Sequence, residues 1–263
     1  MPRFAANLSF MFQEYPFLKR FEAAARAGFQ GVEYLSPYDH TPETLSQCLR
    51  EHGLHQVLFN CAMGDWQANE RGLAALPGRE TEFEASITQA LSYAQTLGCT
   101  QLHVMAGLKP AHTSEETCEA IYRRNLSYAA DYFARHGIRV LIEPINTRDM
   151  PGYFLHTSGQ AKRIIEAVSH PNLFLQMDLY HCQIMEGDLA ERIKALFPII
   201  SHFQIAGNPE RHEPDLGEVH YPYLFDLIDR LGYEGWIGCE YNPLQDTQSG
   251  LRWGRPYGLG RET

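Results

Sequence analysis

The chain has 263 residues, enough for one (β/α)8 barrel or two small domains. Its 22 basic and 32 acidic residues give a net charge of −10 without a clustered basic stripe, which argues against an extended nucleic-acid surface. No apolar run approaches the roughly 18 residues of a membrane span, and the first residues lack the apolar core and cleavage site of a signal peptide. With six scattered cysteines and no C-x-x-C pair, the sequence predicts a soluble cytoplasmic protein with reduced thiols.

Short apolar segments alternate with stretches of helical periodicity along the whole chain, which indicates a parallel sheet. Eight strands favour a closed barrel, and no G-x-G-x-x-G follows the first one, so a nucleotide-binding doubly wound sheet loses its main support. The predicted strands are Phe4–Leu8, Gly31–Leu35, Gln56–Asn60, Gln101–Ala106, Arg139–Ile145, Leu173–Asp178, Ile200–Ile205 and Trp236–Tyr241.

The helices between these strands carry sequence signals at their ends. Thr113 with Glu116, and Thr157 with Gln160, have the spacing of a capping box at a helix N-terminus. Glycines such as Gly137 follow the helical stretches. Nothing resembles a linker, so residues 1–263 are expected to form a single (β/α)8 barrel domain. Residues 254–263 are expected to be a tail that is mobile or packed on a neighbouring molecule.

The two longest stretches without periodicity are Asn60–Arg79 and Asn146–His156. Both follow a predicted strand, so both would lie over the carboxyl-end face of the barrel. Long loops at that face are usually lids or substrate walls. A loop that merely covers the barrel mouth is the alternative.

Four polar residues lie near the ends of the last four predicted strands: Glu143, Asp178, Gln204 and Glu240. They are separated by 35, 26 and 36 residues, each about one strand-plus-helix unit. In a (β/α)8 barrel, their side chains would converge where such enzymes keep their chemistry. Three carboxylates and one amide oxygen are an all-oxygen ligand set, which suits Mg²⁺ or Mn²⁺ better than zinc or copper.

Proton transfer next to a carbonyl is the chemistry that this arrangement suits. A divalent ion that binds the carbonyl and a neighbouring hydroxyl stabilises the negative charge that develops as a C–H proton leaves. Glu143 and Glu240, three strands apart, are the expected base and acid. A carboxylate bound to a cation is a poorer base, so we expect each glutamate to use one oxygen for the metal and the other for the proton.

Further polar residues belong to the same region. His181 is a candidate for binding a substrate hydroxyl or bracing the metal ligands, with a purely structural histidine as the alternative. Arg211 is a candidate for holding a substrate carboxylate through two parallel hydrogen bonds, with an ordinary salt bridge as the alternative. Glu33 is expected near the mouth, and His103 is expected in core packing. Three loop cations are additional candidates for an anionic substrate: Arg71, Arg79 and Lys109.

Long motifs between residue 3 and about residue 253 carry a resemblance to a known family. They are RFAANLS, GVEYLSPYD, GDWQANERG, PGRE, LIEPIN followed by DMPGY, YHCQIMEGDL, HEPDLGEVHYPYLF and GWIGCEYNP. Together they resemble the hydroxypyruvate isomerase family of the xylose isomerase-like barrels. The resemblance implies interconversion of hydroxypyruvate and 2-hydroxy-3-oxopropanoate (tartronate semialdehyde). It also implies catalytic glutamates at Glu143 and Glu240, and metal ligands at Glu143, Asp178, Gln204 and Glu240.

Several alternatives stay open. The related ketose 3-epimerases have a histidine where this chain has Gln204, which leaves the degree of metal dependence open. Very similar proteins are 2-oxo-tetronate isomerases, which act on a four-carbon acid, although LIEPINTRDMPG and YHCQIMEG are more similar to the hydroxypyruvate branch. A hydride shift is the rival to an enediol path. An endonuclease-IV-like hydrolase and a non-catalytic sugar-binding protein are the rival classes. The sequence leaves a homo-oligomer open.

Overall fold

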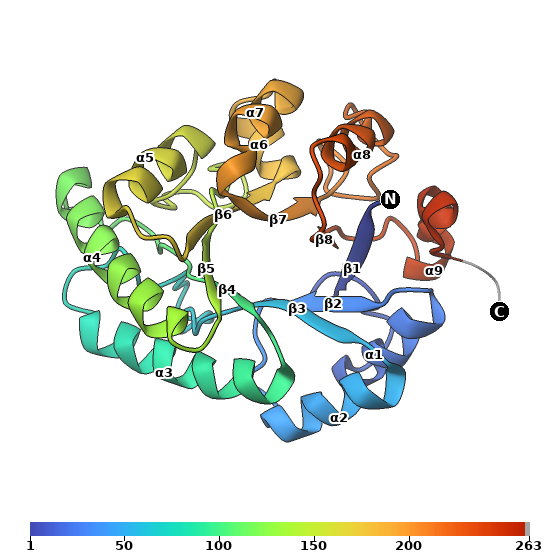
Figure 1. The fold of residues 1–263 in the computed structure, drawn as a ribbon, viewed down its shortest axis with the longest axis horizontal. Coiled ribbons are helices and arrows are strands. Elements are labelled where there is room, and N and C mark those ends of the chain that lie inside the picture. Colours follow the sequence, from blue (N-terminus) through green and yellow to red (C-terminus); the bar gives the residue numbers. More distant parts are fainter. Residues whose placement is uncertain (261–263) are drawn as a thin grey trace.

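The computed structural model describes residues 1–260 of the chain. Eight parallel strands close into a barrel in the order β1 to β8, with β8 paired to β1 (Figure 1). The predicted (β/α)8 fold is therefore confirmed. The strands are β1 Arg3–Asn7, β2 Gly31–Tyr34, β3 His55–Asn60, β4 Gln101–His103, β5 Arg139–Ile142, β6 Leu173–Asp178, β7 Ile200–Ile205 and β8 Trp236–Cys239.

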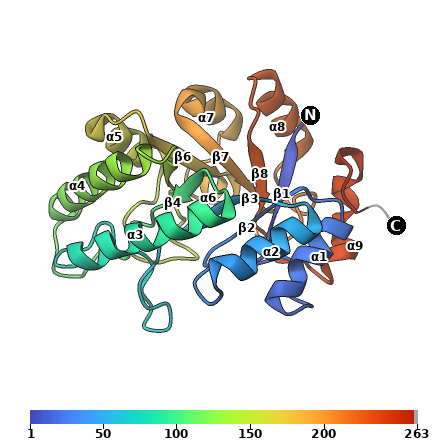
Figure 2. The ribbon, with the colours of Figure 1, turned by 60° about the horizontal axis from the view of Figure 1, so that its bottom comes forward.

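Helices surround this barrel in both views (Figures 1 and 2). Their apolar faces pack against the outside of the strands and form one continuous hydrophobic core. They are α1 Phe17–Arg26, α2 Pro42–His52, α3 Glu80–Leu97, α4 Glu115–Ala134, α5 Ser158–Val168, α6 Leu179–Met185, α7 Leu189–Leu196, α8 Tyr221–Arg230 and α9 Thr247–Gly250. Among residues 1–260, no helix combines the length and the apolar character needed to cross a bilayer.

Strand and helix boundaries agree with the sequence prediction in most places. Strands β6 and β7 match residue for residue, whereas β5 ends at Ile142, so that Glu143 is the first residue beyond it. Thr157 caps α5 as predicted, because its hydroxyl accepts a hydrogen bond from the Gln160 N–H. The predicted cap at Thr113 is wrong by one residue, since the Ser114 hydroxyl accepts the bond at the start of α4.

The end of the chain packs on the barrel itself up to residue 260. A 3-10 helix at Leu251–Tyr257 brings Trp253 and Tyr257 edge-on to Phe4 of β1, with ring centroids 5.1 and 5.2 Å apart. The Gly260 N–H donates to the Ala27 carbonyl at 2.9 Å. For residues 254–260 this differs from the expected mobile or neighbour-bound tail, because apolar rings anchor the segment. Residues 261–263 of that predicted tail lie outside the described part.

Candidate active site

The last four strands bring the predicted site residues together at the carboxyl end of the barrel. Glu143 and Glu240 are the first residues after β5 and β8, Asp178 ends β6, and Gln204 is the fifth residue of β7. All four side chains are almost completely buried. Buried carboxylates are costly unless they are paired or bind a cation, so this cluster needs a partner.

A cavity of about 150 Å³ lies beside these residues. Its polar wall includes Glu143, Asp149, His181, Arg211 and Glu240. The remaining lining is mostly apolar: Phe10, Leu35, Met63, Trp66, Met105, Ile145 and Met150, with the amide of Asn60. The polar wall can bind the anionic or hydroxyl groups of a small molecule. The apolar wall excludes water from the rest of the cavity.

Three residues form the tightest potential cation site. One ligand atom each from Glu143, Asp178 and His181 lie within 4.8 Å of one another. Glu143 Oε1 and Asp178 Oδ2 are buried and have no hydrogen-bond partner. His181 Nε2 lies 3.9 Å from the first oxygen and 3.6 Å from the second, too far for good hydrogen bonds. Two unpartnered carboxylate oxygens facing a common gap are what a bound cation or ligand would satisfy.

Burial raises the pKa values of the carboxyl groups of the site, and these groups raise one another's pKa values further, because each negative charge repels the next. Burial, followed by the charges of Glu240 and Asp178, raises the pKa of Glu143 well above its usual range. Burial raises the pKa of Asp178 to about 6, although the nearby Arg211 charge and two backbone N–H groups oppose this shift. Burial also raises the pKa of Glu240 to about 8, again against the charge of Arg211. One guanidinium does not compensate for this many carboxylates.

Arg211 projects into the cavity from the loop between β7 and α8. Its Nη2 donates to Glu240 Oε1 at 2.6 Å and lies 3.9 Å from Asp178 Oδ2. The guanidinium is 4.8 and 5.0 Å from the ring centroids of Phe10 and Tyr180, so cation–π contacts also hold it. Arg211 is the one arginine in the cavity lining among residues 1–260.

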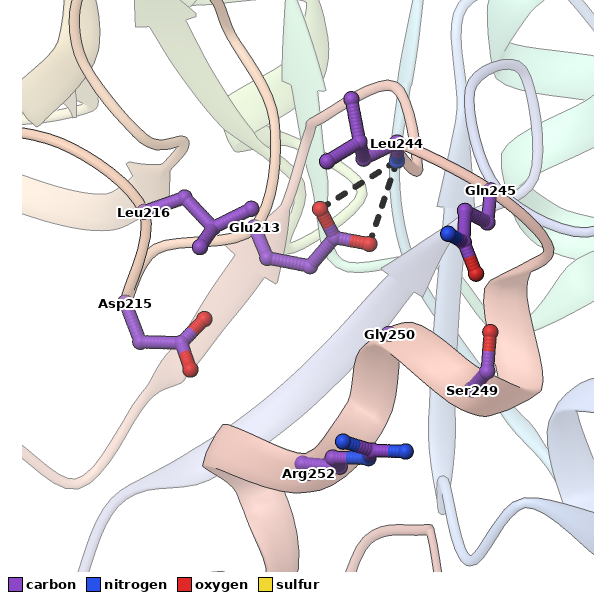
Figure 3. Close-up of a pocket in the computed structure, with 8 residues that line it drawn as sticks. All are labelled: Glu213, Asp215, Leu216, Leu244, Gln245, Ser249, Gly250 and Arg252. Carbon is purple, nitrogen blue, oxygen red and sulfur yellow. Dashed lines mark hydrogen bonds between the residues drawn. The ribbon is translucent and has the colours of Figure 1, made fainter.

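The loop that carries Arg211 is tied to the loop after β8. Arg211 has a φ of 58°, a left-handed conformation that is uncommon for residues other than glycine, and its carbonyl accepts from the Asn242 N–H at 2.8 Å. Figure 3 shows how buried Glu213 reaches across to the Leu244 N–H, which lies 3.2 Å from each carboxylate oxygen. These hydrogen bonds join the loop after β7 to the loop after β8. They therefore hold the backbone of Arg211 in place and fix the position of its guanidinium.

The side-chain amide of Gln204 does not point its oxygen toward the cavity, as a metal ligand would. Its amide nitrogen donates to Glu240 Oε2 and Glu33 Oε1, both at 2.7 Å, and its amide oxygen accepts from Gln176 at 2.6 Å. In this arrangement Gln204 braces Glu240 and directs no free oxygen at the cavity. A role as an oxygen ligand would require the amide to turn over, and it stays a prediction.

Glu33, expected near the mouth, is fully buried and does not line the cavity, and sequence reasoning missed the polar layer that it forms with Asn7 and His202. Asn7 of β1 donates to Glu240 Oε2 at 2.8 Å and to Glu33 Oε1 at 3.2 Å. Glu33 also pairs with His202 Nε2 at 2.7 Å. An asparagine at a strand end is an available signal, but asparagine is also common in turns, so its type alone did not single it out.

The remaining candidates divide between the site and the surface. His103 does more than fill the core, because its Nδ1 lies 3.5 Å from Glu143 Oε2, and burial lowers its pKa to about 3. Arg71 stacks on Trp66, Arg79 pairs with Glu70 and Glu82, and the Lys109 ammonium donates to a backbone carbonyl. These three loop cations do not line the cavity, so Arg211 is the better candidate for a substrate carboxylate.

The long loop between β3 and α3 contributes to the cavity wall. Figure 2 shows it in cyan, projecting away from the barrel. Met63 and Trp66 of this loop line the cavity, and the exposed fraction of Trp66 is 42%. The position of Met63 and Trp66 agrees with the prediction that this loop forms a wall of the substrate site.

Comparisons with known proteins agree with this geometry. A family model described as xylose isomerase-like TIM barrel matches residues 21–257. A 2-oxo-tetronate isomerase from Cupriavidus necator is 56% identical over 99% of this chain and 100% of that protein. The hydroxypyruvate isomerase of Escherichia coli is 46% identical over 98% of this chain and 100% of its own length.

Solved structures show the same fold. A Brucella melitensis protein named AP endonuclease, family 2, superimposes with a TM-score of 0.97 at 52% identity, covering 98% of this chain and 100% of that one. A D-psicose 3-epimerase from Clostridium cellulolyticum shares the fold alone, with a TM-score of 0.79 and 16% identity over 98% and 99% of the two chains. The chain belongs to the xylose isomerase-like TIM barrel family and is an isomerase among relatives named hydroxypyruvate isomerase and 2-oxo-tetronate isomerase.

Proposed function

We propose that the protein moves a carbonyl group between C2 and C3 of a short hydroxy-oxo acid by proton transfer between Glu143 and Glu240. The observation that carries this proposal is the placement of both buried glutamates in the wall of one small cavity that also holds Arg211. The names of the relatives supply the substrate class. Arg211 binds the substrate carboxylate, and His181 binds a substrate oxygen.

The proton transfer proceeds in two steps. One glutamate takes the proton from C3, the C–H electron pair forms the C2=C3 bond, and the carbonyl electron pair moves to the oxygen on C2, which gives an enediolate. The proton of the C3 hydroxyl passes to the C2 oxygen and the carbonyl forms on C3, while the second glutamate delivers a proton to C2. Atoms and electrons balance without a redox partner. A hydride shift between the same carbons is the competing path.

The raised pKa values support acid–base roles for the two glutamates. A general acid or base works best when its pKa lies near the working pH. Burial moves the pKa of Glu240 to about 8 and that of Glu143 in the same direction. The carboxyls interact strongly, so they titrate as a group, and one member can hold a proton while another lacks one.

We further propose Mg²⁺ or Mn²⁺ as the resident cofactor. The unpartnered oxygens of Glu143 and Asp178 fit a hard cation, because carboxylate oxygens are its preferred ligands. Glu240 would join them once its bond to Arg211 is released, and Gln204 once its amide turns over. When bound, the ion would stabilise negative charge on the substrate oxygens.

Two acids are candidates for the substrate. The motif resemblance favoured the three-carbon acid hydroxypyruvate, whereas the 56% identity to a protein named 2-oxo-tetronate isomerase favours the four-carbon acid. We therefore propose 2-oxo-tetronate as the preferred substrate and hydroxypyruvate as the second. One extra carbon changes the discrimination only modestly, so we expect activity on both.

The test is a comparison of kcat/KM on the two acids, with Mg²⁺ or Mn²⁺ added, for the wild type and for Glu240→Gln. We expect turnover of both acids by the wild type, with a larger kcat/KM on 2-oxo-tetronate, and a kcat lower by about 10²–10⁴-fold for the variant. A higher kcat/KM on hydroxypyruvate would reverse the substrate order. The proposal would be overturned if Glu240→Gln kept both activities, or if the wild type turned over neither acid.

A further inference from the structure

Asn146 is a buried residue three positions after Glu143, in the loop between β5 and α5. It has no part in the proton transfer proposed above. Its side chain nevertheless makes a short contact with the site, since Asn146 Nδ2 lies 2.6 Å from Nδ1 of His181 on α6. If Asn146 donates in this contact, His181 Nε2 carries the ring proton and can donate. If His181 Nδ1 donates, Nε2 has a free lone pair and can accept.

The loop itself fixes which way round the Asn146 amide lies. Asn146 Oδ1 accepts from the backbone N–H of Asp149 at 2.8 Å, and a backbone N–H can only donate. Asn146 Nδ2 lies 3.1 Å from the carboxylate of the same residue, which accepts. Turning the amide over would set donor against donor and oxygen against oxygen. The amide nitrogen therefore faces His181.

An amide nitrogen donates and does not accept, so His181 Nδ1 must accept the hydrogen bond through its lone pair. In a neutral imidazole the other nitrogen then carries the proton. A doubly protonated ring would set its own Nδ1–H against the Asn146 amide N–H across 2.6 Å, so the same contact requires a neutral ring. The nitrogen that carries this proton, Nε2, lies 3.9 Å from Glu143 Oε1 and 3.6 Å from Asp178 Oδ2, on the side of the ring that faces the site.

We infer that Asn146 is a positioning residue that fixes His181 in the Nε2–H tautomer, so that His181 is a neutral hydrogen-bond donor and not a metal ligand. A protonated ring nitrogen has no lone pair to give to a cation. Among the three residues of the compact cluster, Glu143 and Asp178 are thus left to bind an ion. His181 donates to the substrate oxygen that gains negative charge. That last part rests on the proposed function, whereas the tautomer does not.

The first test is NMR of wild-type protein labelled with ¹⁵N-histidine at pH 8, free of metal and substrate. Couplings between ring nitrogens and carbon-bound protons separate protonated from unprotonated nitrogens, and the signals that disappear in His181→Gln assign the residue. We expect the proton on Nε2. A proton on Nδ1 would overturn the inference. This result does not depend on turnover, so it stays valid even if both proposed substrates fail.

Asn146→Asp is the sharpest variant, because it keeps the shape of the side chain and replaces the donor by an acceptor. At pH 8 we expect the His181 proton to move to Nδ1 and kcat to fall on the order of 10²-fold, as for loss of one oxyanion donor. Asn146→Ala removes the constraint and should give a mixture of tautomers. Retention of the Nε2 proton alone in Asn146→Asp would show that Asn146 does not set the tautomer.

Mn²⁺ titration followed by electron paramagnetic resonance tests the ligand assignment without any substrate. His181→Ala should leave the Mn²⁺ dissociation constant within about threefold of wild type, whereas Asp178→Ala should raise it by more than about 10-fold. An equal loss of affinity in the two variants would make His181 a ligand and contradict the inference.

Discussion

Glu33 and Glu143 are both buried glutamates on the inner side of the barrel, but their surroundings differ. Glu33 accepts from His202, Gln204 and Asn7 at 2.7, 2.7 and 3.2 Å. Glu143 Oε1 has no hydrogen-bond partner, and its other oxygen lies 3.5 Å from His103 Nδ1. The first carboxylate is satisfied by the protein, and the second is left for something the protein binds.

This difference separates two layers of the barrel interior. The lower layer, with Glu33 and His202, is closed by its own hydrogen bonds, which hold Glu240 through Asn7 and Gln204. The upper layer keeps unpartnered oxygens and raised pKa values beside a cavity. Such a site costs stability and is retained for function. Burial alone does not distinguish the two glutamates, whereas the hydrogen-bond inventory does.

The largest expected effect comes from removing the reactive carboxylates. Glu143→Gln or Glu240→Gln should lower kcat by about 10²–10⁴-fold, the usual contribution of a general acid or base. Steady-state rates with far-ultraviolet circular dichroism would show loss of activity with the fold retained. Glu166→Gln on the exposed side of α5 is the matched control and should leave the rate unchanged. Near-normal turnover in Glu240→Gln would contradict the two-carboxylate scheme.

Removing the satisfied glutamate should damage stability first. Glu33→Ala removes the acceptor of three buried hydrogen bonds, from His202, Gln204 and Asn7, so we expect a loss of about 3 kcal/mol or more in the free energy of unfolding. Urea denaturation measures this loss. Glu143→Gln in the metal-free protein should cost far less, or stabilise, because it replaces a buried carboxyl group whose Oε1 has no hydrogen-bond partner. Equal destabilisation by the two variants would remove the distinction between the layers.

A divalent ion should stabilise the upper layer. Mn²⁺ at about 100 times its dissociation constant should add about 2.7 kcal/mol to the free energy of unfolding, because it binds only the folded protein. Thermal or urea unfolding with and without the ion measures the gain. Asp178→Asn should abolish most of it. An unchanged unfolding midpoint in wild type would argue against a metal site.

The smallest effect is the pH dependence of the metal-free protein. Folding raises the pKa of Glu240 from about 4.5 to about 8, so between these values the native state holds a proton that the unfolded state lacks. Stability then falls as pH rises, by about 1 kcal/mol per pH unit. The lowered pKa of His181 acts in the opposite direction, but only below about pH 6.5. The decline should therefore be clear from pH 6.5 to 8.

Urea unfolding at several pH values, with the metal chelated, measures this slope. Glu240→Gln should make it shallower, because the variant side chain does not titrate; the raised pKa of Glu143 leaves a remaining slope of the same sign. A slope that is unchanged in Glu240→Gln would assign the pH dependence to other groups.

The fold was predictable because the alternation of apolar and helical segments is a local signal, and it placed all eight strands. The neighbourhood of Glu143, Asp178 and Glu240 followed from barrel geometry. The direction of the Gln204 amide did not follow, since it depends on Glu33 across the barrel. Nor did the link from Asn146 to His181, because an asparagine after a strand has many ordinary uses.

The central claim is proton transfer between two carboxylates, and proton NMR of the reaction in D2O tests it most directly. With wild-type protein, Mg²⁺ or Mn²⁺, and 2-oxo-tetronate or hydroxypyruvate, we expect product that carries solvent deuterium at C2. Glu240→Gln should form this product about 10²–10⁴-fold more slowly. Product formed over many turnovers without any deuterium would contradict the proton-transfer account and indicate a hydride shift between the two carbons.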